Sequence, residues 1–112
     1  MTAVLVYVTA GSADEAATIG RALVEGRLVA CANVVDGVRS IYRWQDAIQD
    51  DTEALLIAKT REALVADVVA RVKELHSYDC PCVVALPIVD GNRDFLNWIG
   101  SETTPPEPPP EP

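Results

Sequence analysis

Segments that favour β-strands alternate along this chain with segments that favour helices, and their order is the strongest constraint on the fold. Ala3–Thr9 is apolar at successive positions and rich in valine, as expected for a central strand. Ser12 and Glu15 form a capping box that predicts a helix start, and Gly26 predicts the end of that helix. The other expected elements are strands Val29–Trp44, Thr52–Lys59 and Cys82–Val89, a polar turn Gln45–Asp51, and helices beginning at Thr60 and Asn92. The order β-α-β-β-α-β predicts an α+β, ferredoxin-like fold: one four-stranded sheet with helices on one face, plus a C-terminal helix.

The composition changes close to the C-terminus. Residues 101–112 hold six of the eight prolines, three glutamates and no large apolar side chain. Proline cannot donate to a helix or a sheet ladder, and this stretch has nothing to bury. We therefore predict one folded domain over residues 1–101 and a disordered Pro/Glu-rich tail over residues 102–112. A ligand for a proline-recognising groove is the alternative interpretation of the tail.

The expected strand Val29–Trp44 is too long for a domain of this size. It would reach roughly 50 Å at about 3.3 Å per residue, whereas a compact domain of 100 residues is only about 35 Å across. The strand must bend, for which Gly37 is the candidate, or project beyond the domain. A projecting hairpin is only marginally stable alone, so Tyr42, Trp44 and Ile48 are predicted to lie at an interface with another copy of the chain.

Charge and motifs exclude several classes of protein. The formal net charge of −8 disfavours nucleic acid as a partner, and no apolar run approaches the roughly 20 residues of a membrane span. Three cysteines do not complete a disulfide framework, and the first ten residues do not resemble a signal peptide, so we expect a cytoplasmic protein. The chain has no P-loop, GxGxxG or GxSxG motif, and we expect no enzymatic activity.

Four residues are candidate metal ligands: Cys31, His76, Cys80 and Cys82. On an extended segment, Cys80 and Cys82 would point to the same face, and thiolates select copper(I) or zinc. His76 is the only histidine and either supplies a nitrogen donor or interacts as a cation with the end of its helix. Cys31 either completes a site with His76 or another subunit, or is buried. Burial is also the simpler interpretation of the cysteine pair. The acidic residues from Asp46 to Glu53 are interpreted as a solvated turn.

Several motifs, in this order, resemble the divalent-cation tolerance (CutA) family: Ala30-Cys31-Ala32-Asn33, Ser40–Trp44, Glu53–Thr60, His76-x-Tyr78-x-x-Pro81, Leu86-Pro87-Ile88 and Gly91–Ile99. The resemblance runs from about Ala3 to Ser101. It implies a ferredoxin-like fold, a tight homotrimer, and a link to copper or another divalent cation. It also implies a likeness in architecture to PII-type signalling proteins. Ser77, Cys82 and Phe95 stand where the family usually has Pro, Glu and Tyr, and the thiol at Cys82 would shift a cation site from hard to soft.

Three functions are therefore open. The first is a trimeric, metal-responsive tolerance protein. The second is a PII-like sensor that binds a small anionic metabolite between subunits, which requires an inter-subunit pocket with converging basic groups. The third is a structural trimer that anchors a partner and has no ligand of its own.

Overall fold

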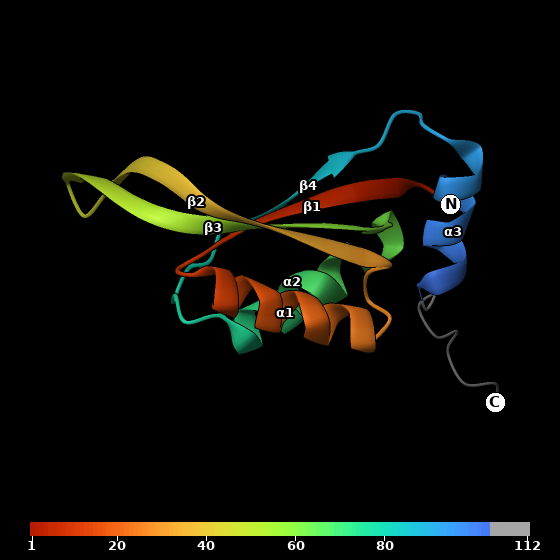
Figure 1. Ribbon diagram of the computed structural model, residues 1–112, viewed down its shortest axis with the longest axis horizontal. Coiled ribbons are helices and arrows are strands. Elements are labelled where there is room, and N and C mark those ends of the chain that lie inside the picture. The colour runs from red at the N-terminus through yellow and green to blue at the C-terminus, as the bar shows by residue number, and fades with distance from the viewer. Residues whose placement is uncertain (104–112) are drawn as a thin grey trace.

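The computed structural model describes residues 1–103 and shows a four-stranded antiparallel sheet at the centre of the molecule (Figure 1). The strands are β1 (Ala3–Ala10), β2 (Cys31–Trp44), β3 (Ala47–Arg61) and β4 (Val83–Pro87), and their order across the sheet is β2-β3-β1-β4. The expected α+β class and the β-α-β-β-α-β order are confirmed.

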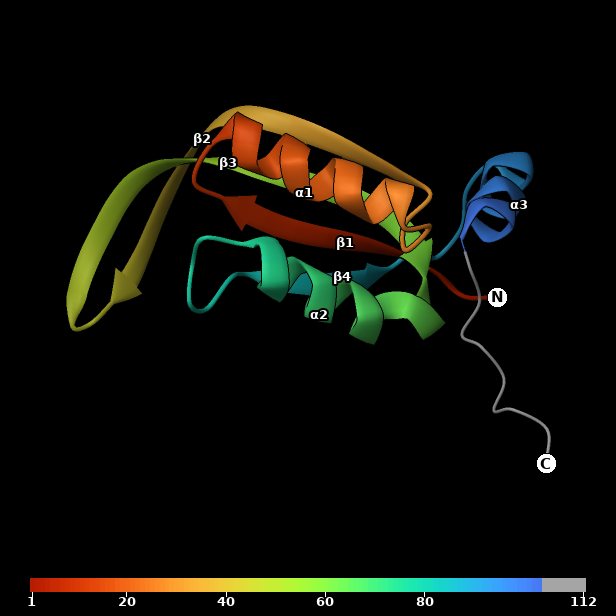
Figure 2. The ribbon, with the colours of Figure 1, turned by 90° about the horizontal axis from the view of Figure 1, so that it is seen from below.

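Two helices, α1 (Ala13–Glu25) and α2 (Val65–Leu75), cover one face of the sheet (Figure 2). Alternate residues of β1 point toward these helices, and Val6 and Val8 are fully buried there. They pack with Leu56 of β3, Leu23 of α1 and Val68 of α2 in one continuous core. Each such side chain contributes about 1.5–3 kcal/mol through removal from water, so this face holds the two helices in place.

The start of α1 is as predicted, but the start of α2 is not. The Ser12 hydroxyl caps α1 by accepting a hydrogen bond from the Glu15 amide at 3.1 Å. Thr60 caps nothing: it lies in β3, and its hydroxyl donates to the carbonyl of Leu28 at 2.7 Å. The strand therefore continues to Arg61, and a short 3₁₀ turn, η1 (Glu62–Leu64), leads into α2.

The hairpin of β2 and β3 projects from one end of the molecule, whose longest extent is 51 Å (Figure 1). Gln45 and Asp46 alone form its turn, both with positive φ, so the predicted polar turn over Gln45–Asp51 is wrong. The register shifts between Val35 and Val38, and Gly37 between them has a φ of 70°, a left-handed conformation that suits glycine. The long strand therefore both bends near Gly37 and projects.

The third helix, α3 (Arg93–Glu102), packs where β1 begins, with Ile99 against Ala3 and Ala30. Asn92 caps it as predicted, accepting from the Asp94 amide at 3.0 Å. The helix continues past Ser101, where we expected extended chain, and Thr103 is buried. The rest of the predicted tail, residues 104–112, lies outside the described residues. No helix within residues 1–103 is long and apolar enough to cross a membrane.

Candidate functional site

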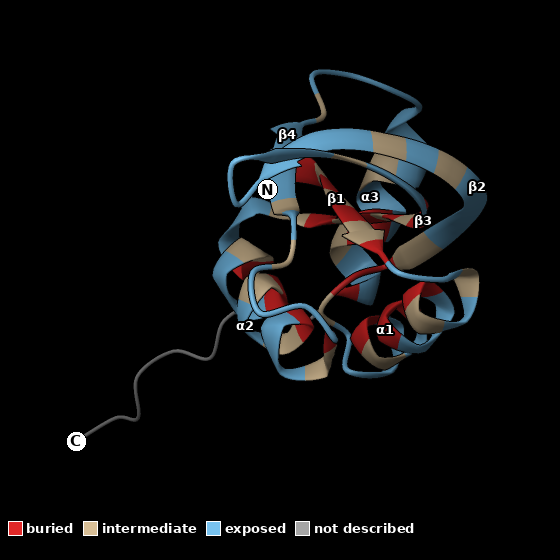
Figure 3. Ribbon diagram, turned by 90° about the vertical axis from the view of Figure 1, so that its left-hand side faces the viewer, coloured by how far each residue is buried: buried red, intermediate tan, exposed pale blue. Residues whose placement is uncertain are grey.

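Within residues 1–103, no helix covers the face of the sheet opposite α1 and α2, called the open face below. Figure 3 shows buried residues on β1 and on the inner sides of the two helices, whereas β2 and β4 are largely exposed or half-buried. Alternation along the strands places Val35 of β2 and Val84 and Leu86 of β4 on the open face, where each keeps 44–51% of its surface exposed. This open face is where a partner or ligand can make contact.

A cleft of about 560 Å³ lies on the open face, between the hairpin and the segment that joins α2 to β4. Its lining falls into four chemical groups: aromatic rings, carboxylates, thiols and hydroxyls. These are Tyr7, Tyr42, Trp44 and Tyr78; Glu53 and Asp79; Cys80 and Cys82; and Thr9 and Ser40. No lysine or arginine is among them.

Glu53 and Tyr78 meet at the wall of this cleft. The Tyr78 hydroxyl donates a hydrogen bond of 2.8 Å to Glu53 Oε2. Burial, followed by this hydrogen bond, raises the pKa of the Tyr78 hydroxyl well above its usual value, so the phenol stays a donor. Glu53 is only 7% exposed, so interpreting it as part of a solvated turn is wrong. Glu53 precedes Leu55 by two residues and Ile57 by four, so alternation places all three on one face of a strand. This spacing was the signal in the sequence that Glu53 belongs to the strand and not to a turn.

His76 is held by hydrogen bonds on both ring nitrogens. It ends α2, and its ring lies against β1, with Nε2 at 2.7 Å from the carbonyl oxygen of Thr9. Nδ1 accepts from the Tyr78 amide at 3.1 Å, which assigns the Nε2–H tautomer. The ring interacts with β1 rather than with the final carbonyls of α2, so the expected helix-end cation is not what the structure shows. In this conformation neither nitrogen has a free lone pair for a metal ion.

Glu15 fixes the start of the segment that carries Tyr78. Its carboxylate accepts from the amides of Gly11 at 3.0 Å and Ser77 at 2.9 Å. Burial raises the pKa of this carboxyl, but hydrogen bonds from Ser77 and Gly11 outweigh it and hold the pKa below its ordinary value. Only the Ser12 half of the predicted capping box is therefore formed, because the Glu15 carboxylate accepts from Gly11 rather than from the Ser12 amide and ties α1 to the cleft segment.

Two of the four predicted metal ligands line one cleft, and the other two, Cys31 and His76, are not among its lining residues. Cys80 and Cys82 are free, exposed and line the same cleft, so the burial interpretation of this pair is wrong for the single chain. Cys31 is half-buried in β2, opposite Lys59, and three strand spacings of about 4.8 Å separate β2 from β4. One subunit therefore does not bring Cys31 to the other thiols. Within residues 1–103, no three His, Cys, Asp or Glu side chains gather closely enough to hold a metal ion.

The predicted interface residues lie on both faces of the hairpin. Tyr42 and Trp44 share the face of Glu53, and the Tyr42 hydroxyl donates to Asp51 at 2.7 Å. Ile48 pairs with Arg43 and points to the opposite face. All three predicted residues are exposed in the single chain, by 41%, 50% and 69% respectively.

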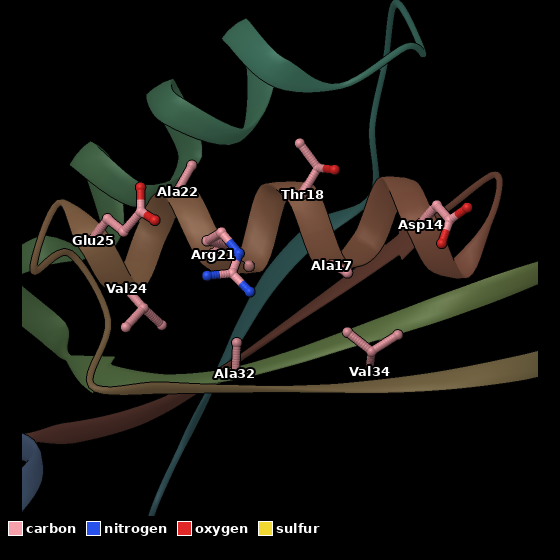
Figure 4. A pocket seen from close by; sticks show the side chains of 10 residues that line it. Asp14, Ala17, Thr18, Arg21, Ala22, Val24, Glu25, Ala32 and Val34 are labelled. Carbon is pink, nitrogen blue, oxygen red and sulfur yellow. The ribbon is translucent and has the colours of Figure 1, made fainter.

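A second groove, of about 790 Å³, runs between α1 and the edge strand β2. Small apolar residues such as Ala17 and Ala32 line most of it (Figure 4). Arg21 lies near its middle, with Asp14 and Glu25 toward the two ends (Figure 4). One arginine between two carboxylates does not make this groove an anion site within a single chain, whereas the expected anion pocket lies between subunits.

The comparisons with known proteins agree with this geometry. The sequence profile of the family described as CutA1 divalent ion tolerance protein matches residues 4–102. The chain belongs to this family. The divalent-cation tolerance protein CutA of Thermus thermophilus is 48% identical over 99 residues, covering 88% of this chain and 96% of the relative. The resemblance seen in the sequence is thereby confirmed.

Solved CutA1 structures share the fold. The protein from Thermus thermophilus superposes with a TM-score of 0.89 at 46% identity, covering 91% of this chain and 99% of that one. CutA1 from Oryza sativa gives a TM-score of 0.90 at 38% identity, covering 93% and 95%. Some CutA relatives are longer: this chain spans 55% of the chloroplastic CutA of Arabidopsis thaliana, which is 38% identical over 100 residues and 89% of this chain.

Proposed function

We propose that this protein is a homotrimer that acts in divalent-cation tolerance by binding copper as copper(I), and that it is not an enzyme. Family membership supports the tolerance role, since relatives carry that name. The observation that carries the copper proposal is the position of two free, exposed thiols, Cys80 and Cys82, on one cleft.

The open sheet face and the projecting hairpin support assembly. Exposed apolar side chains on one contiguous face mark an interaction surface, and an isolated two-stranded hairpin is only marginally stable in water. Trp44, Val84 and Leu86 each keep about half of their surface exposed in the single chain. A second and third copy packed on this face would bury them. The resemblance to the CutA family implies that three subunits assemble.

The donor chemistry favours copper(I) over zinc. Zinc prefers four protein ligands, and within residues 1–103 no group of even three is close together. A pair of soft thiolates suits copper(I), which accepts fewer ligands. Cys80 and Cys82 would hold the ion, while His76 would have to give up its bond to Thr9 or Tyr78 to take part.

We place the protein in the cytoplasm, where its unpaired cysteines would stay reduced. The Archaeoglobus fulgidus relative of known structure is described as periplasmic.

The same contacts favour binding over catalysis. A cysteine nucleophile needs a base within hydrogen-bond reach, and His76 is the only histidine. Its two ring nitrogens already bond to the backbone of Thr9 and Tyr78. The thiols of the cleft are therefore suited to hold a soft ion rather than to attack a substrate.

Competition of the protein with a chromophoric copper(I) chelator, under anaerobic conditions, tests the site. We expect the double variant Cys80→Ser/Cys82→Ser to lose at least tenfold in copper(I) affinity. Cys31→Ser is the matched control, with the same chemical change on another strand, and should bind like the wild type. Equal affinity in all three proteins would contradict the site.

A further inference from the structure

The chain contains two Asp-Gly sequences, Asp36-Gly37 and Asp90-Gly91, and the same contact forms within each. The amide of each glycine donates a hydrogen bond of 2.8 Å to Oδ1 of the aspartate before it, and all four residues are exposed. An aspartate closes to a succinimide ring when the next amide nitrogen attacks its side-chain carboxyl carbon, and glycine has no side chain to hinder the approach. Both contacts therefore hold the reacting groups together, which is the arrangement that speeds an intramolecular reaction.

The surroundings of the two Asp-Gly pairs differ. Asp36-Gly37 lies within β2, and the residues on either side of it are paired with β3. Asp90-Gly91 lies in the link between β4 and α3, outside any helix or strand. The proposed trimer interface consists of the hairpin and the open face, and this link belongs to neither. Ring closure requires the backbone at the aspartate to rotate, and a segment outside the ladder of a sheet rotates more readily. Asp90-Gly91 is therefore the pair that is free to react.

The backbone at Gly91 does not require glycine. A Cβ atom added there would meet only the side chain of Leu96, at 3.8–4.0 Å, which is ordinary van der Waals contact. Among the glycines of residues 1–103, Gly37 alone has a positive φ, so alanine at position 91 is not strained. Alanine at this position can therefore block the approach of the nitrogen without disturbing the fold.

The link between β4 and α3 has little slack. Its first residue, Ile88, donates from its amide to the carbonyl of Ala3 at 3.0 Å. Its last residue, Asn92, caps α3 by accepting from the Asp94 amide at 3.0 Å. An isoaspartyl linkage passes through the side chain, so it adds one atom, and about 1.5 Å, to the main chain between these two fixed points. Such a change would displace the cap and loosen α3.

We propose that Asp90 is a site of spontaneous isoaspartate formation. The Gly91 nitrogen bonds to Asp90 Cγ, and the carboxyl hydroxyl leaves with the amide proton as water. A second water then opens the ring. If it breaks the bond from the nitrogen to Cγ, aspartate is restored. If it breaks the bond from the nitrogen to the main-chain carbonyl carbon, the chain continues through Cγ and the main-chain carboxylate is free.

One water leaves and one enters, so the reaction is an isomerisation that needs no cofactor. Its product is an exposed isoaspartyl carboxylate, the class of substrate that protein isoaspartyl methyltransferases accept. The inference goes beyond the proposed copper function and does not depend on it, because neither thiol takes part.

Ageing of the intact protein at neutral pH and physiological temperature tests the proposal. Isoaspartate is located by peptide mapping with electron-transfer fragmentation and counted by enzymatic carboxyl methylation. We expect it to accumulate at position 90 at least tenfold faster than at position 36, the internal control with the same contact. Gly91→Ala should slow the accumulation at least tenfold. The aged wild type should melt at a lower temperature than fresh protein, and aged Gly91→Ala should not.

Two results would overturn the proposal. Equal rates at position 90 in the wild type and Gly91→Ala would show that the contact with Gly91 does not promote the reaction. A synthetic peptide of residues 86–96, aged beside the protein, gives the second comparison. If the peptide forms isoaspartate and the folded chain forms none at position 90, the fold protects this link and it is not a modification site.

Discussion

His76 donates a hydrogen bond from Nε2 to the carbonyl oxygen of Thr9 at 2.7 Å, across 67 residues of sequence. The bond ties the end of α2 to β1 and sets the position from which the segment carrying Tyr78, Cys80 and Cys82 crosses to β4. His76 therefore positions the segment that lines the cleft, although it is not itself a lining residue.

The first prediction is that His76→Ala costs stability and leaves metal affinity unchanged. The substitution leaves the Thr9 carbonyl and the Tyr78 amide without their partner, which costs about 1–3 kcal/mol when such groups are buried. Urea denaturation measures the stability, and the copper(I) competition assay measures the affinity. A loss of affinity as large as that of Cys80→Ser/Cys82→Ser would instead make His76 a ligand.

The second prediction is that the Glu15 carboxylate stabilises the fold at neutral pH and loses this effect in acid. The pKa of Glu15 is lower in the folded chain than its ordinary value of 4.5, so the carboxylate stabilises the fold above that pH. This contribution is lost as pH falls from about 4.5 through the folded pKa. Glu15→Gln should therefore be less stable than the wild type at pH 7, and the difference should narrow in acid. Denaturation curves at stepped pH values check this.

Asp14→Asn is the matched control for Glu15, since Asp14 is exposed in the same helical turn. It should lose less stability at pH 7 than Glu15→Gln. If the gap between wild type and Glu15→Gln stayed constant from pH 7 to pH 3, the hydrogen bonds from Gly11 and Ser77 would not be the source of the stabilisation.

The third prediction is that Trp44→Ala weakens assembly. A buried aromatic anchor at an interface contributes roughly 2 to 4 kcal/mol, so the variant should dissociate at protein concentrations where the wild type stays associated. Light scattering over a dilution series measures this. Val24→Ala, which truncates an exposed apolar residue on α1, should assemble like the wild type. Identical dilution curves for Trp44→Ala and wild type would remove Trp44 from the interface.

The fourth prediction is that the residues at the end of α3, up to Thr103, stabilise the fold. A chain ending at Gly100 loses the Thr103 hydroxyl, which accepts from Arg61 at 3.0 Å and donates to Ile99 at 2.9 Å. It should melt at a lower temperature than a chain ending at Thr103. Calorimetry of the two truncations decides, and equal melting temperatures would show that Thr103 adds nothing to the packing of α3.

The order of the elements could be predicted from the sequence because each of them carries a local signal. Valine-rich strands, the Ser12 cap and the Asn92 cap all act within a few residues of chain. The start of β3 could not be predicted because strands exposed on both faces need no apolar alternation, so the polar residues of β3 resemble a turn. The role of Thr60 could not be predicted because threonine is favoured both in strands and as a helix cap, and the distant Leu28 carbonyl decides between them.

The cleft could be predicted only in part. Cys80 and Cys82 are neighbours in sequence and line the same cleft, although both precede β4 rather than lying in the predicted strand. Glu53 and Tyr78 are 25 residues apart, and no local pattern reports that a loop tyrosine will reach back to a strand carboxylate. The separation of Cys31 from the other thiols likewise follows from the order of the strands, not from the strand that carries it.

In the proposed function, three copies of this chain assemble and hold copper(I) through Cys80 and Cys82. A native mass spectrum of the copper(I)-loaded protein beside Cys80→Ser/Cys82→Ser tests both parts at once. We expect a species of three 12.0 kDa chains that carries one copper ion per chain, and an equally trimeric double variant that carries none. A monomeric wild type, or a double variant that retains its copper, would contradict it.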